Sequence, residues 1–158
     1  MDMTNRWMRP LSESQERGSQ LVELALVFVL LALLVAGVWD LGRMFRGYIT
    51  IANAARDGAR YAIRLPCLPS NAIQRAALKT AITNAVIAEA AGSGITLTAA
   101  NITITPDPVT TGCPTTSNRD VRVTVTYPHT MWMGGITGLG DVTLSASARM
   151  KWFGNDSG

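Results

Sequence analysis

Histidine is nearly absent from this sequence, since the chain has only His129. A Ser-His-Asp or Cys-His arrangement for nucleophilic catalysis would have to use this one side chain. It stands between Pro128 and Thr130 without a catalytic motif, a setting that favours a loop histidine. The sequence also lacks a glycine-rich phosphate loop and the acidic spacing of a calcium loop. We therefore predict no enzymatic activity, no cofactor and no metal site.

Charged residues are few and well mixed. The 158 residues include 14 Lys and Arg against 11 Asp and Glu, a formal charge of +3, and no block of like charges stands out. A tract that binds nucleic acid or an acidic substrate is therefore not indicated. Charge by itself says little about other partners.

Cysteine is also scarce. The two cysteines, Cys67 and Cys113, have no histidines nearby, so they cannot supply the four ligands of a closed zinc site. Both stand in proline-bearing, loop-like sequence that suits one disulfide bond in an oxidising compartment, and two unrelated free thiols are the alternative. A bond that closes this loop would stabilise a small domain by roughly 4 kcal/mol on the chain-entropy account.

Proline is absent from residues 11–65, so nothing in that stretch forces a helix to break. Within it, residues 24–39 contain no charged or strongly polar side chain. With the apolar pair before Glu23, this segment approaches the roughly 20 residues that cross a bilayer. Apolar and small residues then continue at helical spacing. We predict one helix over residues 19–65, about 70 Å long, with a transmembrane segment at 21–39.

Glu23 interrupts the apolar run near its start. A lone carboxylate costs about 2.5–3.5 kcal/mol in the middle of a membrane and less near an interface, so Glu23 is either interfacial or kept for a role. Gly18 precedes the polar Ser19, and Glu23 is the fifth residue counted from Ser19. This arrangement resembles a type IV prepilin signal. The resemblance implies that a prepilin peptidase cuts after Gly18, and that Glu23 guides filament entry by pairing with the new α-ammonium of Ser19.

A second motif lies further along the predicted helix. Residues 53–62 read Asn-Ala-Ala-Arg-Asp-Gly-Ala-Arg-Tyr-Ala and follow the prepilin-like start. Together the two segments resemble the TadE-like family, the pilin-like minor subunits or pseudopilins of the tight-adherence pilus machinery. The resemblance is strong over residues 17–65 and covers the remainder only in layout. Leu24 stands where members often have Phe, and the apolar run lacks their internal proline, which leaves the helix unkinked.

The N-terminal residues 1–18 show no periodicity and are predicted to be a prepilin-type leader. An ordinary secretory signal is the competing interpretation, with residues 35–37 as a small-residue cleavage site. Against it, the apolar run is long for a signal core, contains a carboxylate near its start and continues as helix. Arginines on both sides of the span leave the positive-inside rule undecided. The cysteine pair and the prepilin-like start instead place the C-terminal domain outside the cytoplasm.

The remaining chain, residues 66–153, has the pattern of a small domain, and 154–158 are predicted to be a flexible tail. A helix is predicted over residues 71–91, capped by Ser70 and stopped by Gly92. Its alanine-rich face is expected to pack on a sheet. This face consists of Ile73, Ala77, Ala81, Ala85 and Ala88.

Alternating apolar and polar residues predict an antiparallel sheet of about three strands after this helix. The sequence therefore predicts an α+β fold in which a long N-terminal helix continues into the small domain. For the Met-Trp-Met run at 131–133, core packing is favoured over an adaptable contact surface. The alternating segments are residues 95–98, 102–105, 121–127 and 142–150.

The resemblance implies a role in pilus assembly. It predicts a single-pass protein of the bacterial inner membrane, with its domain outside the cytoplasm, that acts as a minor pilin or pseudopilin and can enter a surface pilus. Expected partners are the prepilin peptidase, other pilins and pseudopilins, the inner-membrane assembly platform and membrane lipid, with no nucleic acid. The alternative is a membrane-tethered periplasmic interaction module that is never cut.

Overall fold

The computed structural model describes residues 12–65, 67, 71–114, 119–138 and 140–152, with the side chains of all except 12–17, 136 and 137. The chain forms two compact units, Met1–Asp40 and Leu41–Gly158, and each is described by itself. The predicted tail and most of the predicted leader lie outside the described residues.

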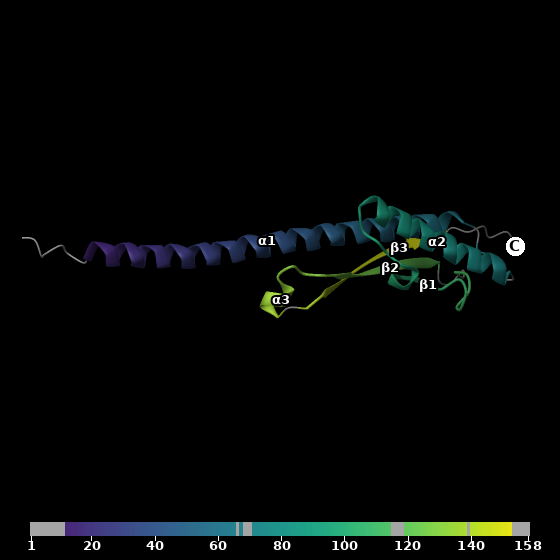
Figure 1. Ribbon diagram of the computed structural model, residues 1–158. Helices are drawn as coiled ribbons and strands as arrows, with labels where there is room; N and C mark the ends of the chain where they lie inside the picture. The colour runs from purple at the N-terminus through teal and green to yellow at the C-terminus, as the bar shows by residue number, and fades with distance from the viewer. Residues whose placement is uncertain (1–11, 66, 68–70, 115–118, 139, 153–158) are drawn as a thin grey trace, which may run out of the picture. The chain divides into compact units, whose positions relative to one another are not determined.

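Helix α1 spans Ser12–Arg64 and is the long helix of Figure 1. It begins before position 19, where the sequence pattern placed its start. The helix ends where expected, because Leu65 precedes Pro66 and a residue before proline is disfavoured in the α conformation.

In the N-terminal unit, the described residues belong to α1 alone. By length and composition, α1 is the one helix in the described part of the chain that could cross a membrane. Its most apolar 18-residue window has mean hydropathy 2.9, and none of that window is buried. Large side chains such as Leu24, Phe28 and Trp39 are exposed. An apolar helix without protein cover suits lipid or a bundle of apolar helices, so α1 is compatible with a membrane anchor.

The second unit contains a three-stranded antiparallel sheet in the order β1-β2-β3 (Figure 1). The central strand β2 pairs with both neighbours and places Val125 opposite Ile102 of β1 and Ala146 of β3. The predicted α+β fold, with a long N-terminal helix, a second helix and three antiparallel strands, is confirmed. The strands are β1 Ile102–Thr105, β2 Asp120–His129 and β3 Val142–Lys151.

Helix α2 spans Ala72–Gly92 and ends in a Schellman-type turn. The N–H of Ile95 donates to the carbonyl of Ala90 at 3.0 Å, and Gly94 takes the left-handed conformation with φ 81°. Glycine adopts this conformation without steric cost, so the stopping glycine is Gly94 and not Gly92 as predicted. The segment that starts at Ile95 was predicted as a strand, but it has no regular structure because its first residue completes this turn.

The start and the packed face of α2 also differ from the prediction. Asn71 is the N-cap, with Oδ1 accepting the backbone N–H of Gln74 at 3.1 Å, and the predicted cap Ser70 lies outside the described residues. The predicted alanine face is wrong, since Ile73 is 82% exposed. Bulky side chains bury more apolar area than alanines and therefore set the packed face. That face consists of Leu78, Ile82, Thr83, Val86 and Ala90.

The core of the second unit lies between the sheet, α2 and residues 41–64 of α1. Apart from Ile51, the α1 face that enters it is built from small residues, so its neighbours approach closely. A Cβ placed on Gly58 would overlap Cγ2 of Val86 in α2, and one placed on Gly47 would come within 3.3 Å of Leu144 in β3. The buried residues of this face are Gly47, Thr50, Ile51, Ala54, Ala55, Gly58, Ala59 and Ala62.

Two short helical segments complete the unit, the 3-10 turn η1 Ala99–Asn101 and α3 Gly134–Thr137. Trp132, shortly before α3, is 81% exposed. The prediction that the Met-Trp-Met run packs in the core is therefore wrong for this tryptophan. Trp152 after β3 is half-buried against the core and donates its Nε1–H to the carbonyl of Leu65 at 3.4 Å. The end of the described chain is thereby tied to the end of α1.

Candidate functional site

The residues predicted to take part in processing and assembly lie together on α1. Gly18, Ser19 and Glu23 are all helical and exposed. A Cβ placed on Gly18 would meet nothing within 4 Å, so the fold does not require glycine there. Ser19 and Glu23 are four positions apart, which in a helix places them on one face about 6 Å apart along the axis. An α-ammonium at Ser19 would therefore be within reach of the Glu23 carboxylate of its own chain.

The second motif, residues 53–62, divides into two faces of α1. Its alanines and glycine face the core, as Gly58 does against Val86. Its charged residues are exposed, and Arg56 donates to the Oδ1 of Asn53 at 3.4 Å. The small residues of the motif therefore allow the C-terminal part of α1 to pack closely against the rest of the domain.

Both motifs are thus placed on one helix, and a family comparison covers the same stretch. Residues 18–60 match the TadE-like protein family. The match begins at Gly18, includes Glu23 and ends inside the 53–62 motif, so over this segment it agrees with the predicted resemblance to the TadE-like family. It leaves the α2 and sheet region outside the matched TadE-like segment. No curated protein and no solved structure matches the chain significantly.

Beyond the TadE-like segment, the structure joins Cys67 and Cys113 as a disulfide with a Cα–Cα distance of 5.6 Å. The bond connects the chain just after α1 to the loop between β1 and β2, across 46 residues of sequence. Both sulfurs lie next to the core, Cys67 as a buried member and Cys113 packed against it. This pairing fits the disulfide predicted from the loop context of the two cysteines.

Because every cysteine is paired, the purified protein is expected to resist maleimide labelling until it is reduced. Unreduced full-length protein, unfolded in denaturant so that burial does not protect a thiol, should gain no label by mass spectrometry. After reduction it should gain two labels, one on each of Cys67 and Cys113. Labelling of both thiols without reductant would contradict the disulfide and weaken the case for an oxidising compartment.

The loop that carries Cys113 is also tied to α2 by an ion pair. Nζ of Lys79 lies 2.6 Å from Oδ2 of Asp107, and Oδ1 of Asp107 accepts the N–H of Val109 at 2.8 Å. Burial raises the pKa of the Asp107 carboxyl, but the hydrogen bond and charge of Lys79 and the backbone N–H groups outweigh it and hold the pKa below its usual value. The carboxylate is therefore ionised at neutral pH and fixes the start of the loop against α2.

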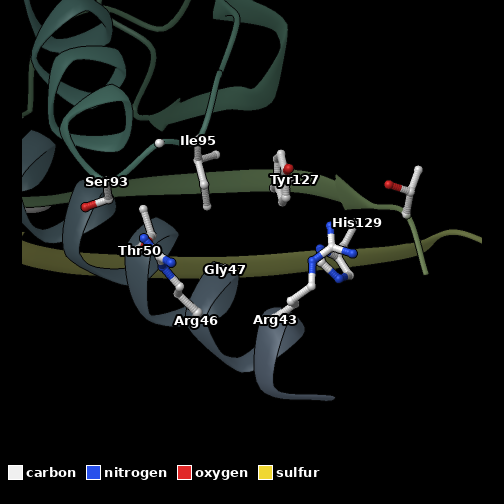
Figure 2. Close-up of a pocket in the computed structure, with 10 residues that line it drawn as sticks. Arg43, Arg46, Gly47, Thr50, Ser93, Ile95, Tyr127 and His129 are labelled. Carbon is white, nitrogen blue, oxygen red and sulfur yellow. The ribbon is translucent and has the colours of Figure 1, made fainter. Parts of the chain in front are cut away.

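A polar pocket of about 250 Å³ opens in the second unit, between α1, the turn after α2 and the end of β2 (Figure 2). Arg43 and Arg46 stand on α1, while Tyr127 and His129 come from β2 and Ile95 from the turn. His129 was predicted to be a loop residue, but it is the last residue of β2 and is only 5% exposed. Its Nε2 makes no hydrogen bond within the described part of the chain. A buried polar atom left in this way costs about 1–3 kcal/mol.

Sequence reasoning missed three of these features: the close contact at Gly58, the Lys79–Asp107 pair and the pocket at His129. Only the first had a readable signal, namely small residues repeated at helical spacing in the 53–62 motif. The described residues contain no group of three His, Cys, Asp or Glu side chains placed to hold a metal ion.

Proposed function

We propose that this chain is a minor pilin or pseudopilin that takes part in the assembly of a tight-adherence pilus. The observation that carries the proposal is the TadE-like match over residues 18–60, the segment that holds Gly18, Ser19 and Glu23. In this account a prepilin peptidase cuts after Gly18, and the mature helix then leaves the lipid for a bundle of like helices. Glu23 guides that transfer through its charge, and the protein acts in assembly without catalysing a reaction.

An apolar stripe on α1 beyond the predicted span supports a helix-bundle partner. Leu41, Phe45 and Tyr48 recur at helical spacing, and all three are exposed instead of facing the core of their own domain. Apolar side chains grouped on one side of a helix favour a protein partner when they lie outside the lipid. The helices of other pilins and pseudopilins offer a matching apolar surface, and the inner-membrane assembly platform would bring them together.

The proposed location is the bacterial inner membrane, with a single span and the disulfide-bonded domain outside the cytoplasm. The apolar α1 supports the anchor, and the Cys67–Cys113 bond supports an oxidising compartment for the domain.

Cleavage after Gly18 is tested by changing the size of that residue. Gly18→Phe should accumulate as uncut precursor, while the matched control Gly18→Ala should be shortened nearly as fast as wild type, because the peptidase must approach the backbone closely there. Gly18 is exposed and a Cβ there meets nothing within 4 Å, so Gly18→Ala introduces no clash with the fold. The measurement is pulse-chase and gel mobility in cells with active prepilin peptidase. If the Gly18→Phe precursor is shortened as fast as wild type, the cut lies elsewhere or does not occur.

A further inference from the structure

The pocket around His129 has the composition of an anion site and no part in the proposed assembly role. Among the described residues, its lining includes two arginines and one histidine but no carboxylate. Asp40, one turn before Arg43 in the sequence, is not among the lining residues. The described side chains that line the pocket therefore carry a net positive charge.

The most specific feature of the pocket is the imidazole of His129. His129 lines the open pocket although the residue is 95% buried, and its Nε2 is itself shielded from solvent and has no hydrogen-bond partner among the described residues. A buried ring nitrogen that carries its proton can donate to an oxygen placed in that pocket. A partner in the pocket would satisfy an atom that the fold itself leaves unsatisfied.

The arginines define the charge of that partner. Arg46 is exposed on α1 and lines the pocket, so its planar guanidinium can bind two oxygens of one anion at once. Arg43 already takes part in another interaction and adds positive charge from one helical turn before Arg46. A group with several oxygens on one centre fits an arginine fork and an N–H donor together, which a single carboxylate does less well.

We propose that the pocket formed by Arg43, Arg46 and His129 binds a phosphate group, with Arg46 gripping two of its oxygens and Nε2–H of His129 donating to another. Arg43 and Arg46 follow Trp39, the last residue of the apolar run, by four and seven positions in the chain. A phospholipid headgroup and a free phosphate ester are therefore the two sources of this chemistry. Phosphate binding itself does not depend on the pilus role, whereas the headgroup source rests on the proposed membrane anchor.

The test uses the single histidine of the chain as its reporter. Full-length protein with isotope-labelled histidine, purified without a histidine tag in maltoside micelles, gives ring NMR signals from His129 alone. In one arm inorganic phosphate is titrated against chloride at equal ionic strength. In the other arm phosphatidylglycerol is added to the micelles, with dioleoylglycerol, which lacks the phosphate, as reference. Arg46→Gln is compared with Arg60→Gln, an exposed arginine on the same helix that does not line the pocket.

We expect a saturable shift of the His129 ring signals in at least one arm, weakened at least fivefold in Arg46→Gln and unchanged in Arg60→Gln. A shift with inorganic phosphate identifies free phosphate as a ligand, and a shift with phosphatidylglycerol alone identifies the headgroup. Because Arg46 is exposed, the variant should keep the fold, which an unchanged near-ultraviolet circular dichroism spectrum of the ligand-free sample verifies. Absence of a saturable shift in both arms, or equal binding by Arg46→Gln and wild type, would overturn the proposal. Neither result bears on cleavage after Gly18.

Discussion

Gly58→Ala should lower the free energy of unfolding of the domain by about 1–3 kcal/mol, the usual cost of overpacking a core. The added methyl group would overlap Cγ2 of Val86, a branched side chain held at the centre of the core. Elsewhere in a helix the same change is stabilising by up to about 1 kcal/mol, because alanine is the better helix former. Gly42 supplies that comparison, since it lies on the same helix and a Cβ there meets nothing within 4 Å.

The two glycine variants are therefore expected to differ in sign. The measurement is chemical denaturation of the full-length protein in mild detergent, followed by near-ultraviolet circular dichroism, which reports packing in the domain. In a Val86→Ala background, where Cγ2 is gone, the cost of Gly58→Ala should largely disappear. Equal effects of Gly58→Ala and Gly42→Ala would show that α1 and α2 do not depend on this close approach.

Glu23→Ala should leave the protein in the membrane and remove it from the pilus machinery. Loss of a charge from an apolar segment makes insertion as good as before or better. If the carboxylate pairs with the α-ammonium of Ser19 in a subunit contact, its removal leaves a buried, unpaired charge, which typically costs about 3–5 kcal/mol. Since 1.4 kcal/mol is a factor of ten, recovery of the variant with assembly complexes should fall at least tenfold.

The control for this variant is Val27→Ala, which shortens an exposed side chain one turn further along α1 without changing charge. Membrane fractions of both variants should match wild type, and only Glu23→Ala should be missing from pilus or assembly-complex fractions. Equal recovery of wild type and Glu23→Ala would mean that the glutamate is merely interfacial. The uncut, tethered module would then be the better account of the chain.

The features that follow from local pattern were predictable from the sequence. The long helix needs only an apolar run and the absence of proline up to Pro66, and the strands show strict alternation. The packed face of α2 was misassigned because alanines at regular spacing resemble a face, whereas Leu78, Ile82 and Val86 bury more area. The stopping glycine of that helix was placed two residues early, because Gly92 and Gly94 are the same residue type and differ only in backbone conformation.

The pocket could not have been predicted, because its residues come from parts of the chain that meet only through tertiary packing. Arg43 and Arg46 belong to α1. His129 is the last residue of β2, where it pairs with Val142 of β3. No local sequence motif indicates that these residues lie together. By contrast, Gly18 and Glu23 could be singled out because their spacing is local and independent of the domain.

The central claim, that this chain is processed as a prepilin, depends on one peptide bond. The direct measurement is the N-terminal residue of the protein purified from cells with active prepilin peptidase, determined by intact mass and terminal sequencing, with peptidase-deficient cells as the control. The account predicts a mature chain that begins at Ser19 in the first cells and an uncut chain in the second. A chain that keeps residues 1–18 in the presence of the active peptidase would contradict it.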